Sequence, residues 1–303
     1  MSGGPPPDAS TRRQRLGAAR PGNRSPLQFR TEFERAFAFF KGRQSLQAIL
    51  ARRLLMCGTP DDDELADHLI RERRRRTRMD GSTADSLVLT ARATWEMMEL
   101  GAPHDHAGVV RMTGYLLNRQ DQPGRWSEDG AAGNGFFSPG SGDEPIAPLA
   151  LPSGTTFHDD DDARFVASCL ALRAVLRAGH ERRAAVRAHI EGLLSIRTID
   201  PHLMFVALGA LGTAPPEFGP RVAPLMDAVA ERQLEDGSWP GVTIFHAADL
   251  ILAVPTAAAY AAVRRAAPFI AGMQTASGAF DASESESIAL IALRALDASR
   301  TAY

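Results

Sequence analysis

Residues 233–239 read QLEDGSW: a Gln, three further residues, a Gly, one more residue and an aromatic side chain. The same pattern occurs in QDQPGRW at 120–126 and in QTASGAF at 274–280. Each copy lies between one amphipathic helical segment and the next. Three matching copies predict a fold built from repeated helix pairs.

The spacing of the glycines supports this repeat. Gly237 and Gly278 lie 41 residues apart, and Gly81, in a degenerate fourth copy that starts at Met79, lies 43 residues before Gly124. The 113 residues between Gly124 and Gly237 suit two repeats and one long loop. We expect each glycine to end the first helix of its pair as a C-cap, with the aromatic side chain packed over the turn.

Apolar residues recur at helical spacing along nearly the whole chain, so the sequence predicts an all-α protein of about eleven helices. Many of these segments are rich in Ala, which allows helices to pack closely. The exception is 121–157, a Gly-rich stretch too long for an ordinary connection. The expected helices cover 32–56, 62–78, 83–100, 105–119, 161–178, 181–196, 202–211, 218–234, 243–254, 257–274 and 284–298.

The composition limits the function classes. The chain has 303 residues, of which 44% are hydrophobic, and a net charge of −2, which gives no overall field to attract nucleic acid. Residues 1–28 lack an apolar core and predict a disordered arm ahead of one domain at 29–303. No run of 18 apolar residues predicts a transmembrane helix. The only cysteines, Cys57 and Cys169, cannot form a disulfide framework, which favours a cytoplasmic protein.

The Gln-xxx-Gly-x-Trp units of 79–298 resemble the QW repeats of the terpene cyclase and protein prenyltransferase superfamily. This resemblance implies an (α/α)6 barrel, a toroid of paired helices whose inner layer surrounds an apolar cavity. Eleven expected helices are one short of the twelve that such a barrel contains.

A run of four aspartates stands ahead of one Ala-rich segment, in HDDDDARF at 158–165. Adjacent carboxylates cannot all ionise cheaply, so at least one should have a raised pKa and keep a proton for general acid catalysis. A solvated cap of the helix is the alternative interpretation. The run also resembles the Asp-x-Asp-Asp motif of class II terpene cyclases, which implies that Asp161 is the proton donor and that Asp159 and Asp162 support it.

Two histidines are candidates to orient the acid. The resemblance to hopene-type cyclases implies His202, and that to prenyltransferase β subunits implies His246, there a zinc ligand. Asp161 stands where those prenyltransferases have a cysteine ligand, so a zinc site is not expected. Either histidine also fits an ordinary core residue. We expect no required cofactor, with Mg2+ accompanying a substrate only if it carries a diphosphate.

Cationic cyclisation needs aromatic side chains around a dry cavity. Arg125 and Arg164 are the nearest candidates for binding substrate anions. The basic run Arg71–Arg78 and the acidic run Asp61–Glu64 are interpreted as helix ends that complement the helix dipole. The aromatic candidates for substrate contact, most of them also explicable as packing residues, are Trp126, Phe157, Trp239 and Phe245.

The sequence therefore predicts a terpene cyclase-like enzyme that cyclises an isoprenoid by protonation. Larger class II cyclases place the site between two barrels, so here either the 121–157 loop closes one barrel or two chains form a homodimer. One rival is a carbohydrate-active toroid with Asp161 and Asp249 as paired carboxylates. The other is a non-catalytic barrel that binds isoprenoids, lipids or a partner. The cyclase hypothesis predicts a closed apolar cavity with Asp161 at one end.

Overall fold

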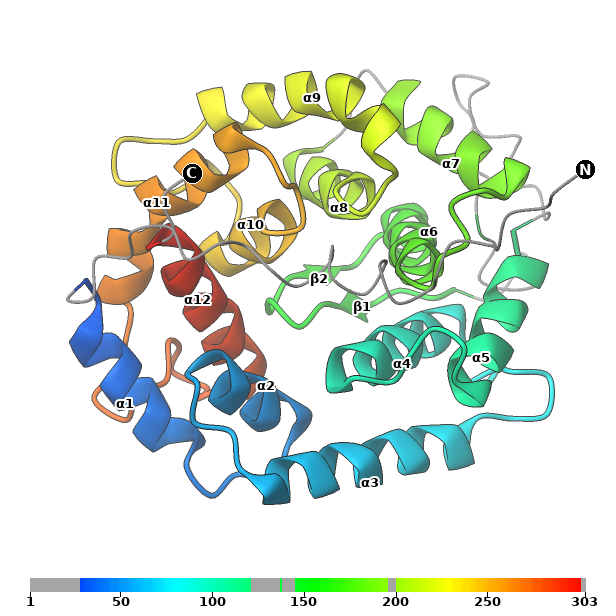
Figure 1. Cartoon of the computed structure of the whole chain (residues 1–303). Coiled ribbons are helices and arrows are strands. Elements are labelled where there is room, and N and C mark those ends of the chain that lie inside the picture. Colours follow the sequence, from blue (N-terminus) through cyan, green and yellow to red (C-terminus); the bar gives the residue numbers. More distant parts are fainter. Residues whose placement is uncertain (1–27, 121–136, 138–144, 196–199, 301–303) are drawn as a thin grey trace, which may run out of the picture.

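The computed structural model describes residues 28–120, 137, 145–195 and 200–300, and its helices form a closed double ring (Figure 1). The predicted all-α toroid of paired helices is confirmed. The outer helices are α1 (Arg30–Phe40), α3 (Pro60–Arg76), α5 (Ala107–Asn118), α7 (Ala184–Ser195), α9 (Gly219–Glu231) and α11 (Ala257–Gly272). The inner helices are α2 (Leu46–Leu54), α4 (Leu87–Leu100), α6 (Asp160–Arg177), α8 (Pro201–Leu211), α10 (Ile244–Ile251) and α12 (Glu286–Ser299).

Each inner helix contacts the next, and α12 contacts α2, so the inner ring is continuous. Buried alanines such as Ala163, Ala167 and Ala171 let α6 approach its neighbours closely. Because the chain alternates between outer and inner helices, the inner helices all run in one direction. Their N-termini therefore gather at one mouth of the ring, which we call the N-terminal mouth.

The expected single helix at 32–56 is two helices, and this accounts for the missing twelfth. The break lies between Phe40 and Leu46, where Gly42 has a φ of 76°. Ser45 then caps α2 by accepting a hydrogen bond from the N–H of Ala48 at 3.0 Å. The apolar pattern continues across the break because both helices face the core, which hides the turn from periodicity.

The repeat glycines were predicted as C-caps, and this was wrong. Gly237 lies beyond the C-cap of α9, which is Arg232, and Gly278 lies beyond that of α11, which is Met273. Both have positive φ, 86° and 91°, and a Cβ would collide with a backbone carbonyl of the following outer helix. The glycine is thus needed for close approach between consecutive outer helices.

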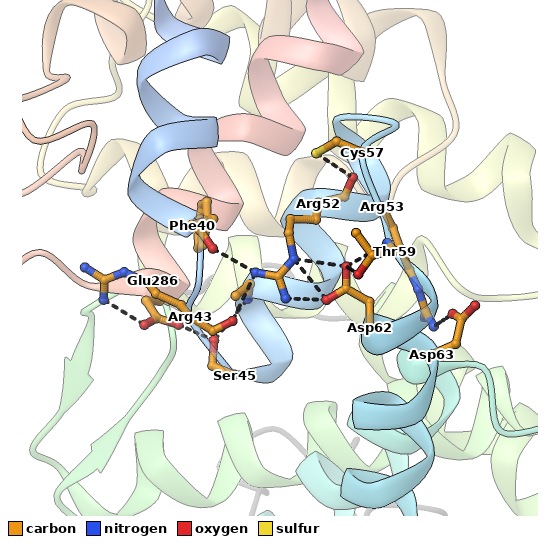
Figure 2. Close-up of polar contacts among 11 residues, drawn as sticks. Phe40, Arg43, Ser45, Arg52, Arg53, Cys57, Thr59, Asp62, Asp63 and Glu286 are labelled. Carbon is orange, nitrogen blue, oxygen red and sulfur yellow. Dashed lines mark hydrogen bonds and ion pairs between the residues drawn. The ribbon is translucent and has the colours of Figure 1, made fainter.

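The repeat glutamines bind the same neighbours. Gln233 donates from Nε2 to the carbonyl oxygens of Gly237 and Ala262, both at 2.8 Å. Gln274 donates in the same way to Glu32 in α1 at 2.9 Å. The last repeat therefore joins the last outer helix to the first. The inner ring is closed nearby, where Glu286 accepts hydrogen bonds from Arg43 and Ser45 (Figure 2).

Part of the expected long loop at 121–157 is a hairpin. Strand β1 (Leu149–Ala150) pairs antiparallel with β2 (Thr156–Phe157), and the hairpin occupies the centre of the ring (Figure 1). Arg92 of α4 donates to the carbonyl of Ala150 at 3.1 Å, and the hydroxyls of Thr155 and Thr243 are 3.1 Å apart. The hairpin therefore blocks the N-terminal mouth. Residues 121–136 and 138–144 of the loop, like the arm up to residue 27, lie outside the described residues.

The acidic run Asp61–Glu64 does more than complement a helix dipole. Thr59 and Asp62 form a capping box at the start of α3, and Asp62 is buried against Arg52 of α2. Arg52 also donates to the carbonyls of Phe40 at 2.7 Å and Arg43 at 3.0 Å (Figure 2). This buried ion pair joins the first three helices.

Candidate active site at the N-terminal mouth

Asp159 is the N-cap of α6. Its carboxylate accepts hydrogen bonds from the N–H groups of Asp161 at 2.9 Å and Asp162 at 3.2 Å. These bonds satisfy backbone donors that no helical carbonyl can reach. Asp159 therefore caps α6, as the capping interpretation of the aspartate run expects.

Asp160, which the motif leaves unspecified, positions the loop ahead of the hairpin. It accepts hydrogen bonds from the N–H of Ile146 at 2.5 Å and from Nε of Arg164 at 2.6 Å. Partial burial opposes its ionisation, but these bonds and one from Ala147 outweigh the burial and hold the pKa of Asp160 below its ordinary value. Arg164, expected to bind substrate anions, is itself buried and paired with Asp160.

The two remaining aspartates differ in their surroundings. Asp161 is exposed at the surface, whereas Asp162 is half-buried. Burial first, and then the negative charges of Asp159, Asp200 and Asp161, raise the pKa of Asp162 above its ordinary value. In the part of the chain that the structure describes, no cationic side chain forms an ion pair with Asp162. Asp162 is therefore the aspartate of this run best placed to keep a proton.

His202 and His246, the two candidate partners, lie side by side with ring centroids 5.6 Å apart. Phe157 lies over both, at 6.5 Å from His202 and 6.1 Å from His246. The ring of His246 is buried, and burial lowers its pKa. Its Nε2 lies 3.1 Å from the carbonyl oxygen of His202, so Nε2 carries the proton and Nδ1 accepts from the hydroxyl of Ser153 at 3.3 Å.

Asp200 connects the acid run to the histidines. It is the N-cap of α8, where it accepts the N–H of His202 at 2.8 Å. Its charge also acts on Asp162 and on His246. Sequence analysis did not select Asp200, although an Asp directly before Pro at a helix start was a visible capping signal. The neighbouring N-termini of α6, α8 and α10 thus bring acids and histidines to one mouth.

The other predicted contact residues separate into two groups. Arg125 and Trp126 lie outside the described residues. Phe245 is buried in the core, and Trp239 is buried with its Nε1 donating to the carbonyl of Val229 at 2.9 Å. The Trp239 ring packs edge-to-face on Phe205, with centroids 5.6 Å apart. These aromatic side chains are mainly packing residues of the repeat.

An apolar pocket of about 410 Å³ lies beside the Asp200 cap. It begins at Pro201, the residue after Asp200, and continues along Met204 and Phe205 of α8 to Trp239 and the end of α9. Its walls are almost entirely hydrocarbon, in contrast to the acidic helix ends next to it. An apolar ligand held here would lie along the first turns of α8.

A second cavity, of about 130 Å³, lies inside the ring, with all six inner helices and the hairpin contributing to its wall. Asp249 lines it, but none of the four consecutive aspartates does. The expected pair of Asp161 and Asp249 is therefore not formed. Nor is this the closed apolar cavity expected with Asp161 at one end, because Arg92, Arg173 and Arg294 line it.

Comparison with known proteins gives matches of structure alone. No protein-family model matches the chain, and no curated protein matches it either. A solved protein from Actinoplanes matches with a TM-score of 0.58 at 15% identity, over 89% of this chain and 99% of that one. The type II terpene cyclase MstE from Scytonema matches with a TM-score of 0.55 at 13% identity, over 89% of this chain and 97% of that one.

These matches establish a terpene cyclase-like fold for the chain. Because 97% of the solved cyclase chain is covered, that chain contains little beyond the ring that it shares with this protein. The matched cyclase chain therefore has no room for a second barrel of similar size. Among the described helices, none is both long and apolar enough to cross a membrane. Within the same residues, no group of three or more His, Cys, Asp or Glu could hold a metal ion.

Proposed function

We propose that this protein is a terpene cyclase-like enzyme that protonates an isoprenoid at the N-terminal mouth, with Asp162 as the proton donor. One observation carries the proposal: Asp162 is half-buried, has a raised pKa and has no cationic partner among the described residues. The likeness in fold to a type II terpene cyclase supports the reaction class. The donor therefore differs by one residue from Asp161, the donor that the motif implies.

The chemistry needs a proton, a helix end and an apolar surface. The O–H bond of Asp162 breaks as a C–H bond forms at one alkene carbon, which leaves a carbocation that the next double bond attacks. The carboxylate that remains lies in the first turn of α6, where the helix dipole stabilises negative charge by about 0.3–1 kcal/mol. The final cation loses a proton to a base or captures water.

The apolar pocket along α8 is the proposed site for the hydrocarbon chain. Its volume of about 410 Å³ lies within the range of roughly 300–1,000 Å³ that is usual for small-molecule sites. Trp239 and Phe205 supply aromatic surface next to it, which suits a developing cation. A site of this size favours a short isoprenoid over a long polyene.

The remaining parts of the proposal rest on the sequence. They are a cytoplasmic location, a homodimer, and Mg2+ if the substrate carries a diphosphate. The basic run Arg71–Arg78, at the end of α3, offers little support for diphosphate binding. Arg73 pairs with Glu96 at 2.8 Å, Arg76 pairs with Glu72 at 2.5 Å, and Arg78 pairs with Asp85.

The proposal is tested by incubating the protein with farnesyl diphosphate, geranylgeranyl diphosphate and squalene, followed by mass spectrometry of the products. We expect a cyclised product from the wild type and a rate about 10²- to 10⁴-fold lower for Asp162→Asn, because general acid catalysis contributes on that order. Asp161→Asn is the matched control and should keep most of the activity.

Three outcomes would contradict the proposal. No cyclised product from any substrate would reject cyclase activity towards them. Full activity in Asp162→Asn with loss in Asp161→Asn would return the donor role to the motif residue. Undiminished binding of an isoprenoid by Asp162→Asn, with no turnover by either protein, would favour a carrier. Circular dichroism of each variant verifies that its fold is intact.

A further inference from the structure

The central cavity is lined by charged side chains of both signs, three arginines (Arg92, Arg173 and Arg294) and three acids (Glu96, Glu99 and Asp249). Arg173 and Arg177 come from the last turns of α6, and Arg294 comes from α12. Two of them share one carboxylate, Glu99 of α4: Arg294 binds it at 3.1 Å and Arg177 lies 3.9 Å away. Neither of these ion pairs includes Arg173.

Arg173 lines the cavity without a carboxylate partner among the described residues. Its guanidinium carbon lies 4.3 Å from the centroid of the Trp95 ring, which fixes the plane of the guanidinium group. Its Nε is buried and has no hydrogen-bond partner, and Arg173 forms no ion pair with any described residue. A buried N–H donor without an acceptor costs about 1–3 kcal/mol. An acceptor supplied by a ligand would remove that cost.

The opposite wall presents a carboxylate. Asp249 of α10 lines the cavity, and α10 lies across the inner ring from α4, which carries Trp95 (Figure 1). Asp249 forms no ion pair with any described residue. Leu151 and Pro152 of the hairpin close the cavity between the two walls. The cavity thus contains one cation, Arg173, and one carboxylate, Asp249, that have no ion-pair partner among the described residues, together with apolar side chains.

We propose that the central cavity binds a small hydroxy- or amino-carboxylate, whose carboxylate pairs with Arg173 and whose hydroxyl or ammonium group donates to Asp249. Arginine is suited to this role because its N–H groups match a carboxylate in a bidentate arrangement. The cavity volume of about 130 Å³ limits the size of the ligand. A protein cavity of roughly 150 Å³ holds a molecule the size of benzene.

Isothermal titration calorimetry with 3-hydroxypropanoate, β-alanine, acetate and inorganic phosphate tests the site. We expect at least one of the two bifunctional acids to bind at least about 10-fold more tightly than acetate, because both can also donate to Asp249 and acetate cannot. Arg173→Gln should weaken that binding about 10- to 100-fold. Asp249→Asn should remove most of the preference over acetate, and it provides a second readout if Arg173→Gln fails to fold.

Arg221→Gln is the matched control, because Arg221 lies on α9 and pairs with Glu191 at 2.5 Å on the exposed outer surface. It should bind as the wild type does. The proposal is overturned if none of the four compounds binds at millimolar concentration, if Arg173→Gln binds as tightly as the wild type, or if phosphate binds more tightly than both bifunctional acids. Asp162→Asn should bind these compounds as the wild type does. The test of this site is therefore independent of the proposed cyclase activity.

Discussion

Asp62 and Asp162 occupy the same position in their helices, the third residue after the N-cap, yet their carboxyl groups meet opposite surroundings. Asp62 is held against Arg52, whose hydrogen bonds lower the pKa of Asp62 despite its burial. Asp162 has no such partner, and burial with neighbouring carboxylates raises its pKa. The neighbour in space, rather than the place in the helix, decides which aspartate holds its charge.

The ring explains why the neighbours differ. An outer helix such as α3 begins at the face where an inner helix ends, so the acid in its first turn meets Arg52 from the last turn of α2. At the N-terminal mouth, inner helices begin side by side. Acids that favour helix N-termini then meet one another, as Asp162 meets Asp200. The parallel inner layer thus brings like charges together at this mouth.

The largest expected effect on stability comes from breaking the paired member. Asp62→Asn should lower the free energy of unfolding at pH 7 by about 3–5 kcal/mol, because it leaves Arg52 buried without its counter-charge. Urea unfolding measures the loss. Asp63→Asn, which removes an exposed partner of Arg53, should change stability by less than about 1 kcal/mol.

The loss of stability caused by Asp62→Asn should depend on pH in a definite direction. The folded-state pKa of Asp62 is lowered, so its contribution is present above the unfolded-state pKa and is lost as the pH falls through the folded-state pKa. The stability gap between wild type and variant should therefore narrow in acid. A gap that stays constant down to the lowest pH at which both proteins fold would mean that Asp62 acts by packing alone.

Substitution of Asp162, the aspartate without a cationic partner, should change stability in the opposite direction. Asp162→Asn should raise the free energy of unfolding at pH 7, by less than about 1 kcal/mol, while it lowers turnover by about 10²- to 10⁴-fold. The folded-state pKa of Asp162 is raised, so the wild type gains stability as the pH falls through that pKa towards the unfolded-state value. The higher free energy of unfolding of the variant, relative to the wild type, should then disappear on acidification. Thermal unfolding from pH 7 downward measures it, and destabilisation at pH 7 would contradict the assignment.

The smallest expected effect concerns Asp200, whose negative charge is one of those that raise the pKa of Asp162. Asp200→Ser removes the charge and keeps a capping oxygen for the N–H of His202. The pKa of Asp162 should shift down towards its ordinary value, and the loss of turnover with rising pH should begin at lower pH. A carbon-detected NMR titration of the Asp162 carboxyl checks the shift. An unchanged titration would show that burial and the other two aspartates, without Asp200, raise this pKa.

Periodicity and the repeats were enough to predict paired helices, because the Gln and Gly recur at several junctions between outer helices, and the resemblance to QW-repeat proteins added the ring. Two features of the structure could not be predicted in this way. The break before Ser45 lies inside a continuous apolar pattern, and the hairpin at Leu149–Phe157 has too few residues for a strand period. Local sequence could also place the glycines at turns, but not show that their task is contact with the following helix.

The site was predicted only in part for a related reason. The run Asp159–Asp162 marks a helix start, but four identical letters cannot show which one caps, which one binds Arg164 and which one is buried. His202 and His246 were selected separately, and the structure brings both together with Phe157. Asp200 matters because its charge acts on Asp162 and His246, which are far away in sequence. Arg173 matters because it forms no ion pair with any described residue. Local sequence shows neither fact.

The contact of Glu286 with Arg43 also has a consequence for biosynthesis. It joins residues 243 positions apart, and α12 supplies both this contact and, through Arg294, part of the cavity wall. During translation, chains grow N-terminus first at about 5–20 residues per second. Until α12 has left the ribosome, α2 and α10 lack the helix that lies between them, and their apolar inner faces stay uncovered. The nascent protein therefore stays open to aggregation and to chaperones at these faces until α12 is made.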